Sequence, residues 1–219
     1  WPEAAQSCRS LSGGGRLFAA LPYILREADR EYLETLYGKV TESGIFQGFL
    51  IRSMDGLGFL RKMDRGSRAM SVRTDAGIYA WNGSALEELS GLADGFCLPY
   101  ELNASAQRHL CEDARQKGLT IMLSCEKIIY SRIPMMITAN CLRRTMGQCK
   151  KGLEAKKGQE TLCLRDRYRK EFPVLVDCLH CMNIIYNSVP FSLHATGWNE
   201  RLDLRMDFTL ESPDEVRQL

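Results

Sequence analysis

Short apolar runs alternate with amphipathic stretches through roughly the first 140 residues of the chain. Apolar runs occur at residues 17–25, 45–52, 69–81, 94–99, 119–124 and 135–138 and are typical of buried strands. Between them, helices are predicted at residues 28–37, 55–63, 84–91 and 103–117. Ser84 is the expected N-cap of the third helix, Asn103 or Ser105 that of the fourth, and Gly118 ends the fourth.

This alternation predicts parallel strands that are joined by helical crossovers. Roughly five such units fit before residue 140, whereas a complete eight-stranded barrel needs about 250 residues. The expected fold class is therefore α/β, a partial (β/α)8 TIM-like barrel formed by residues 1–140. The chain begins at Trp1, and we expect an amino-terminal part of the same protein to precede it.

The pattern changes after Asn140. A Gly-, Lys- and Gln-rich stretch at 147–160 predicts a loop, and 160–167 and 171–176 predict two extended arms joined by a polar turn at 168–170. Alternation over 202–210 predicts a half-exposed strand. Residues 141–219 are thus expected to form a second part, a Cys-rich β-hairpin appendage.

Nine cysteines are present in the 219 residues. Four of them, Cys8, Cys97, Cys111 and Cys125, lie in or beside apolar runs and are expected to be buried in a reduced, cytoplasmic protein. The remaining group contains Cys141, Cys149 and the CxxC pair Cys178 and Cys181. Four thiolates brought together by the hairpin would hold zinc or an iron–sulfur cluster.

The spacing of these cysteines bears on the metal. Cys141 and Cys149 are separated by seven residues, which is wide for a zinc knuckle and modestly favours an iron–sulfur cluster. Zinc stays the alternative. Cys163 is a further thiol close to the set and could replace Cys178 as the third ligand.

Basic residues concentrate in one window. Residues 141–170 contain ten Lys or Arg and three Asp or Glu, a balance of +7, so the rest of the chain carries −5 of the net +2. Such a window predicts binding of RNA or another anionic partner, or a solvated loop. No apolar run approaches the roughly 18 residues that a membrane-spanning helix needs, so no membrane partner is expected.

Several segments, taken in order, resemble peptidase family U32, the collagenase-like proteases. They are Leu21-Pro-Tyr-Ile-Leu-Arg, Thr74-Asp-Ala-Gly-Ile-Tyr-Ala-Trp-Asn82, Leu98-Pro-Tyr-Glu-Leu-Asn103, Tyr130-Ser-Arg-Ile-Pro-Met-Met, Thr138-Ala-Asn-Cys141, Arg165-Asp-Arg167 and Cys178-Leu-His-Cys-Met-Asn-Ile-Ile-Tyr-Asn-Ser188. The resemblance covers most of the chain from about residue 16. One departure is Ser131, where the family often has glycine.

The resemblance implies a (β/α)8 barrel with the cysteines near one mouth. It also implies a [4Fe-4S] cluster on Cys141, Cys149, Cys178 and Cys181, and hydroxylation or a related modification of RNA or a small aromatic substrate. The family's peptidase name implies the alternative of a hydrolase acting on collagen or unfolded protein. A third hypothesis is a zinc-stapled module that binds nucleic acid.

Polar residues at the predicted strand ends are the catalytic candidates, because barrel active sites collect there. They are Asp75, Glu101 and Arg132, with Asn82 as a further candidate. Glu101 and Arg132 are the preferred pair, as substrate contacts or as each other's partner. The segment 183–188 is expected to support the cluster loop. No HExxH or GxSxG motif favours a hydrolase.

Overall fold

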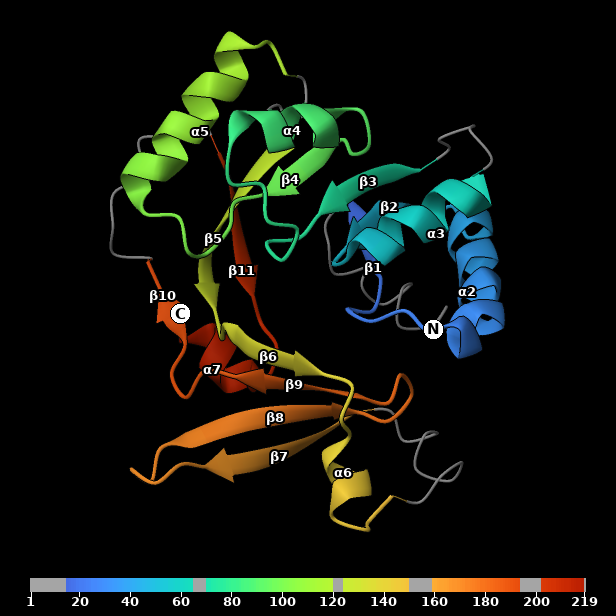
Figure 1. Ribbon diagram of the computed structural model, residues 1–219, viewed down its shortest axis with the longest axis vertical. Coiled ribbons are helices and arrows are strands. Elements are labelled where there is room, and N and C mark those ends of the chain that lie inside the picture. Colours follow the sequence, from blue (N-terminus) through green and yellow to red (C-terminus); the bar gives the residue numbers. More distant parts are fainter. Residues whose placement is uncertain (1–14, 65–69, 120–123, 150–158, 194–201, 219) are drawn as a thin grey trace. The chain divides into compact units, whose positions relative to one another are not determined.

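The computed structural model describes residues 15–64, 70–119, 124–149, 159–193 and 202–218. The chain divides into two compact units, residues 1–127 and 128–219, and the boundary falls inside one strand. Figure 1 shows the elements of both units.

Unit 1 is a parallel sheet with helical crossovers. Its strands are β1 (Leu17–Ala20), β2 (Phe46–Ile51), β3 (Ser71–Thr74), β4 (Gly95–Cys97) and the start of β5 (Cys125–Ser131), paired in that order and all parallel. Its helices are η1 (Glu27–Asp29), α2 (Arg30–Glu42), α3 (Met54–Asp64), α4 (Gly83–Ser90) and α5 (Ala104–Gln116). The predicted α/β class is confirmed for this unit.

The strands of unit 1 contribute buried apolar residues to its core. Ile51, Phe96 and Cys97 are at most 1 % exposed, as expected for parallel strands that helices cover. Gly48 is required by close packing, because a Cβ there would collide with the backbone of Ser71. The described part of the chain therefore holds four β/α units and the strand that opens a fifth.

Two helix starts illustrate how the local sequence sets these elements. Asn103 caps α5 by accepting a hydrogen bond from the Ala106 amide, as predicted. The prediction of Ser84 as the cap of α4 is wrong, since Asn82 accepts from the Ala85 amide. Both residues are good N-caps, and the helix begins two residues earlier than the polar pattern indicates.

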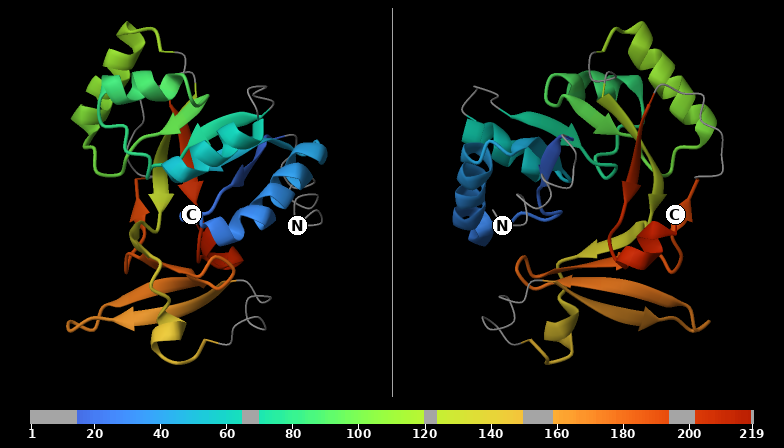
Figure 2. Two further views of the ribbon diagram at one scale, coloured as in Figure 1. Left: turned by 45° about the vertical axis from the view of Figure 1, so that its right-hand side comes forward. Right: turned by 180° about the vertical axis from the view of Figure 1, so that it is seen from behind.

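Unit 2 contains a four-stranded antiparallel sheet. Its strands are β6 (Pro134–Thr138), β9 (Met182–Tyr186), β8 (Glu171–Asp177) and β7 (Gln159–Arg165), paired in that order. Figure 2 shows these strands side by side from two directions. The prediction that residues 135–138 continue the parallel series is wrong, because β6 pairs antiparallel with β9. A four-residue run alone does not reveal its partner's direction.

The remaining elements of unit 2 are short. They are α6 (Leu142–Thr145), β10 (Phe191–Ser192), β11 (Asp203–Asp207) and α7 (Pro213–Arg217). β10 pairs antiparallel with the end of β5, and β11 also pairs with β5. The strand predicted at 202–210 therefore corresponds to β11, which is half exposed.

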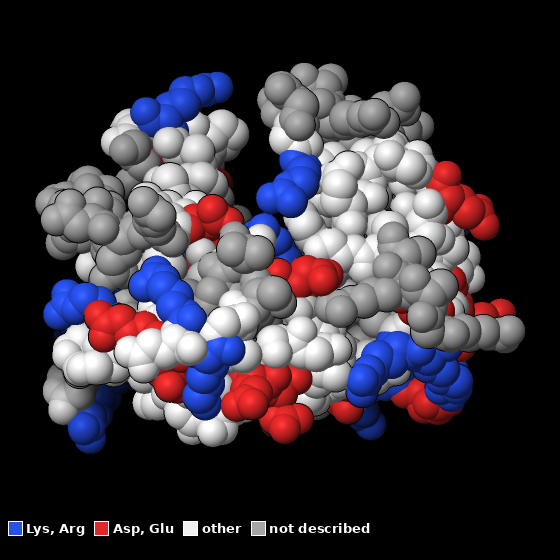
Figure 3. All heavy atoms as spheres, turned by 90° about the horizontal axis from the view of Figure 1, so that it is seen from above, with Lys and Arg blue, Asp and Glu red and all other residues white. Residues whose placement is uncertain are grey.

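The helices and the surface charge complete the description. Within the described ranges no helix is both long and apolar enough to cross a membrane. Figure 3 shows acidic and basic side chains interspersed over the face that it presents. Charge of one sign therefore does not dominate that face.

Candidate metal centre

The pairing of β6 with β9 brings two distant cysteine segments to one end of the unit 2 sheet. Thr138, the last residue of β6, lies opposite Asn183 near the start of β9. Cys141 follows Thr138 by three residues and Cys181 precedes Asn183 by two. Asn183 Nδ2 also donates to the Asn140 carbonyl at 2.7 Å. This hydrogen bond ties the loop that carries Cys141 to the strand that follows the CxxC pair.

The CxxC segment is the turn that joins β8 to β9. Asp177, at the end of β8, lies opposite Met182, at the start of β9, and Cys178 to Cys181 form the loop between them. The buried Asp177 holds this turn, because its Oδ1 accepts from the His180 amide at 3.0 Å and its Oδ2 lies 2.9 Å from His180 Nδ1. Cys181 has a φ of 47°, which is uncommon outside glycine.

The other cysteine pair is joined by the short helix α6. Cys141 is its N-cap residue, and the Thr145 amide donates back to the Cys141 carbonyl at 3.0 Å. Gly147, with a φ of 68°, turns the chain just after the helix. Cys149 follows and is exposed. Arg143 on α6 forms an ion pair with Glu160 at the start of β7.

The pKa of the Cys178 thiol responds to the charged groups around it. Burial raises the pKa of the Cys178 thiol, and Arg143 opposes that shift. Cys141, Glu160 and Cys149 each raise the same pKa further. Cys141 and Cys149 therefore lie close enough to Cys178 for their charges to act on it.

The sheet register separates Cys163 from the CxxC turn. Cys163 lies opposite Pro173 on β8, whereas the turn begins after Asp177. Four residues of strand span about 13 Å. This separation argues against Cys163 as a replacement for Cys178.

The two cysteine segments lie side by side, but their thiols are not arranged as ligands. Within the ranges that the structure describes, no three His, Cys, Asp or Glu side chains stand where they could hold one metal ion. Cys141 and Cys178 are half-buried, whereas Cys149 and Cys181 are exposed. As a donor set, four cysteines suit zinc or an iron–sulfur cluster rather than hard cations. The chemistry of the set fits the predicted groups.

The basic window is only partly described. Lys150, Lys151, Lys156 and Lys157 lie outside the described residues. Among the others, Arg143 pairs with Glu160 and Arg165 pairs with Glu171, and the Arg167 guanidinium stacks on the Tyr168 ring at 4.8 Å. The two ion pairs offset part of the positive charge that the composition indicates.

Of the catalytic candidates, Arg132 lies in unit 2 and has internal partners. Its Nη1 donates to the carbonyls of Asn187 and Ser188, at 3.3 and 3.0 Å, and its Nε lies 3.7 Å from Glu211 Oε1. Glu211 has a side chain only 2 % exposed and also accepts from the Tyr130 hydroxyl at 3.2 Å. These contacts give Arg132 a structural part in unit 2.

Asp75 and Glu101 lie in unit 1, after the ends of β3 and β4. Glu101 is exposed. Asp75 is 5 % exposed and binds Arg52, the residue that follows β2, with Arg52 Nε 3.2 Å from Asp75 Oδ2. The Arg52 guanidinium also stacks over the Tyr23 ring at 4.5 Å. Sequence reasoning missed Arg52, although its place directly after an apolar strand is the signal that identified Asp75.

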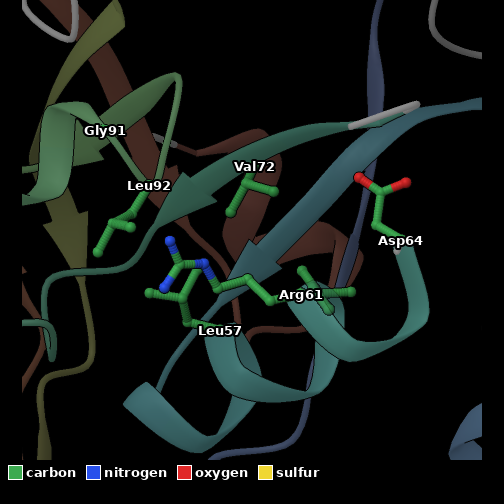
Figure 4. A pocket seen from close by; sticks show the side chains of 7 residues that line it. Leu57, Arg61, Asp64, Val72, Gly91 and Leu92 are labelled. Carbon is green, nitrogen blue, oxygen red and sulfur yellow. The ribbon is translucent and has the colours of Figure 1, made fainter. Parts of the chain in front are cut away.

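A small pocket lies elsewhere in unit 1, between α3 and the end of α4. It measures about 260 Å³ and is lined mainly by Leu57, Leu60, Val72 and Leu92. Figure 4 shows the Arg61 side chain lying across it, with Asp64 at its rim. None of the sequence-predicted site residues lines this pocket.

No family model, no curated protein and no solved structure matches this chain.

Proposed function

We propose that unit 2 binds a [4Fe-4S] cluster through Cys141, Cys149, Cys178 and Cys181. The observation that carries this proposal is the antiparallel pairing of β6 with β9, reinforced by the hydrogen bond from Asn183 to Asn140. It sets a loop with two cysteines beside a turn with two more. Closing the set requires movement of the exposed Cys149 and Cys181, which belong to loops and not to strands.

We further propose that the chain forms part of a U32-type (β/α)8 barrel enzyme that hydroxylates or otherwise modifies RNA or a small aromatic substrate. Four consecutive parallel β/α units support the barrel part of this proposal. A bound cluster would supply electron transfer or substrate activation. The chain's own contribution would be the four thiolates and the guanidinium of Arg143, which favours the anionic form of Cys178.

Metal analysis of protein prepared without oxygen tests the cluster. We expect about four irons and four sulfides per chain, and absorbance near 400 nm. Cys141→Ser, Cys149→Ser, Cys178→Ser and Cys181→Ser should each lower the iron content, whereas the matched control Cys163→Ser should not. One zinc per chain in place of iron, lost in the same four variants, would refute the cluster and support a zinc staple.

Activity assays test the enzyme class separately. Anaerobic protein with iron should modify RNA or an aromatic substrate, detected as a mass increase of the substrate. Cleavage of gelatin that survives Cys141→Ser would contradict this function and support the peptidase alternative.

A further inference from the structure

Apart from the cysteine segments of unit 2, a group of polar residues lies in unit 1, at the carboxyl ends of its parallel strands. Tyr23 follows β1, Arg52 follows β2 and Asp75 follows β3. β1, β2 and β3 are neighbours in the sheet, so these residues share one edge. In parallel α/β sheets this edge is where ligands bind.

Arg52 is held on two sides and open on a third. Its Nε is fixed by Asp75 at 3.2 Å, and its plane lies on the Tyr23 ring at 4.5 Å. Its side chain is 28 % exposed, and among the described residues its two terminal nitrogens donate to no acceptor. A guanidinium positioned in this way presents its outer edge for bidentate binding of a carboxylate or phosphate. Because Arg52 is already ordered, little entropy is lost on binding.

The loop after β3 adds a pair of exposed aromatic rings. Tyr79 is 60 % exposed and Trp81 49 %, whereas the intervening Ala80 is 1 % exposed. The two rings lie 6.4 Å apart between centroids, at 48°. Buried Ile78 and Ala80 therefore anchor the segment while the two aromatic side chains project outward. Large rings exposed as a pair are typical of a binding surface.

The arginine and the aromatic loop are parts of one local structure. The Asp75 carboxylate that fixes Arg52 also accepts from the Ala76 amide at 2.8 Å, and the Asp75 carbonyl accepts from the Ile78 amide at 2.9 Å. A Cβ on Gly77 would lie 3.7 Å from the Arg52 carbonyl. Asp75 thus positions both the cation and the start of the loop that carries the rings.

We propose that Arg52, Tyr79 and Trp81 form a binding subsite for a planar aromatic ring that carries an anionic group. The ring stacks on the exposed aromatic side chains, and the anion pairs with the outer edge of Arg52. Asp75 and Tyr23 act as positioning residues. This inference deepens the proposed function by naming the substrate chemistry, and it does not require the cluster.

Direct binding tests the subsite on the full chain. The background carries Trp1→Phe and Trp198→Phe, so that Trp81 is the fluorescent reporter. The probes are 4-hydroxybenzoate, uridine 5′-monophosphate, uridine and inorganic phosphate. We expect 4-hydroxybenzoate or uridine 5′-monophosphate to quench Trp81 and to bind at least tenfold more tightly than uridine or phosphate. If 4-hydroxybenzoate binds more tightly, the ligand of the subsite is a small aromatic acid. If uridine 5′-monophosphate binds more tightly, the ligand is an RNA nucleotide.

Variants then assign the contacts by calorimetry, which needs no fluorescent reporter. Arg52→Lys and Tyr79→Ala should each weaken binding of the better probe about tenfold, and Trp81→Phe should retain more affinity than Trp81→Ala. The exposed pair of Arg167 and Tyr168 in unit 2 has a similar arginine–ring contact, so Arg167→Lys and Tyr168→Ala are matched controls that should bind as the parent does.

Two outcomes would overturn the subsite: no probe binds, or the surface variant Tyr79→Ala and Arg52→Lys both bind with unchanged affinity. Binding is measured on metal-free as well as metal-loaded protein. Protein that contains no iron after anaerobic preparation but still binds a probe would refute the proposed cofactor and leave the subsite standing. A protein that holds iron but binds no probe would refute the subsite and leave the proposed cluster standing.

Discussion

The Asn183 side chain, fully buried on β9, donates a hydrogen bond to the backbone carbonyl of Asn140 across 43 residues of sequence. The bond lies beside the end of the β6–β9 ladder, where the register places Thr138 opposite Asn183. It joins the loop that carries Cys141 to the strand that follows the CxxC turn. The role of residues 183–188 in supporting a cluster loop stays a prediction, and this contact gives it a physical basis.

Asn183→Ala should weaken both the stability of unit 2 and its hold on metal. Asn183→Ala removes this hydrogen bond, worth about 0.5–1.5 kcal/mol net, and takes side-chain atoms out of a fully buried position. We expect a lower urea midpoint and a lower iron content after anaerobic purification.

Asn103→Ala is the matched control for Asn183→Ala. Asn103 caps α5 in unit 1, and its loss costs about 1 kcal/mol. The control should lower stability and leave the iron content unchanged. Wild-type iron content in Asn183→Ala would contradict a role for this bond at the metal site.

Thiol reactivity distinguishes the predicted ligands from the other cysteines. Cys97, Cys111 and Cys125 are at most 3 % exposed. The pKa of the Cys125 thiol is raised, first by its hydrogen bond with Cys111 and then by burial, so its reactive thiolate is scarce. In a Cys8→Ser background, these three thiols should react with a disulfide reagent only after unfolding.

Bound metal should change the reactivity of some exposed thiols and not of others. Cys149, Cys163 and Cys181 are exposed and should react rapidly in metal-free protein. Bound metal should protect Cys149 and Cys181 and leave Cys163 reactive, which mass spectrometry of the labelled peptides would measure. Protection of Cys163 with a reactive Cys178 would instead make Cys163 the ligand.

Much of unit 1 could be predicted because its signals are local. Strands such as β2 and β4 are apolar runs, and α5 has both a capping Asn103 and a terminating Gly118, whose φ is 66°. β6 shows the limit of this reasoning. Its run of apolar residues resembles the earlier strands, and only the pairing with β9, far along the chain, determines its direction.

The candidate sites also include features that the local sequence reveals and contacts that it does not. The four cysteines could be predicted as metal ligands from their spacing, because a CxxC pair and a second pair are visible in the sequence. Arg132 was predicted as a catalytic candidate, but its contact with Glu211 depends on a residue 79 positions later, which no local pattern indicates. Arg52 follows β2 directly, so its position was visible in the sequence, but its pairing with Asp75 after the next strand was not.

The ion pair between Arg73 and Glu126 should stabilise unit 1. The two side chains are 13 % and 10 % exposed, and Arg73 also lies on the Phe18 ring at 5.0 Å. Glu126→Ala leaves the Arg73 charge without this partner in a largely buried place, which costs about 3–5 kcal/mol. Urea unfolding should show this loss.

The exposed pair of Arg165 and Glu171 is the matched control for Glu126→Ala, with side chains 65 % and 56 % exposed. Glu171→Ala should cost less than about 1 kcal/mol. Equal losses in the two variants would show that burial does not set the strength of the Arg73–Glu126 pair.

Glu211 should make unit 2 sensitive to acid. Burial favours the neutral carboxyl, but the amides of Thr209 and Leu210 and the Tyr130 hydroxyl outweigh it, so that the pKa of Glu211 lies below its usual 4.5. A carboxylate with a lowered folded-state pKa stabilises the protein fully above the unfolded pKa. That contribution is lost as the pH falls through the folded-state pKa.

The free energy of unfolding should therefore fall more steeply between about pH 5 and pH 3 in the parent protein than in Glu211→Gln. At pH 7 the variant should be the less stable of the two, since a neutral amide replaces the carboxylate beside Arg132. Glu88→Gln, on the exposed face of α4, should keep the parent's dependence on pH. Parallel curves for the parent and Glu211→Gln, measured by urea unfolding at each pH, would show that this carboxylate is not preferentially ionised in the folded state.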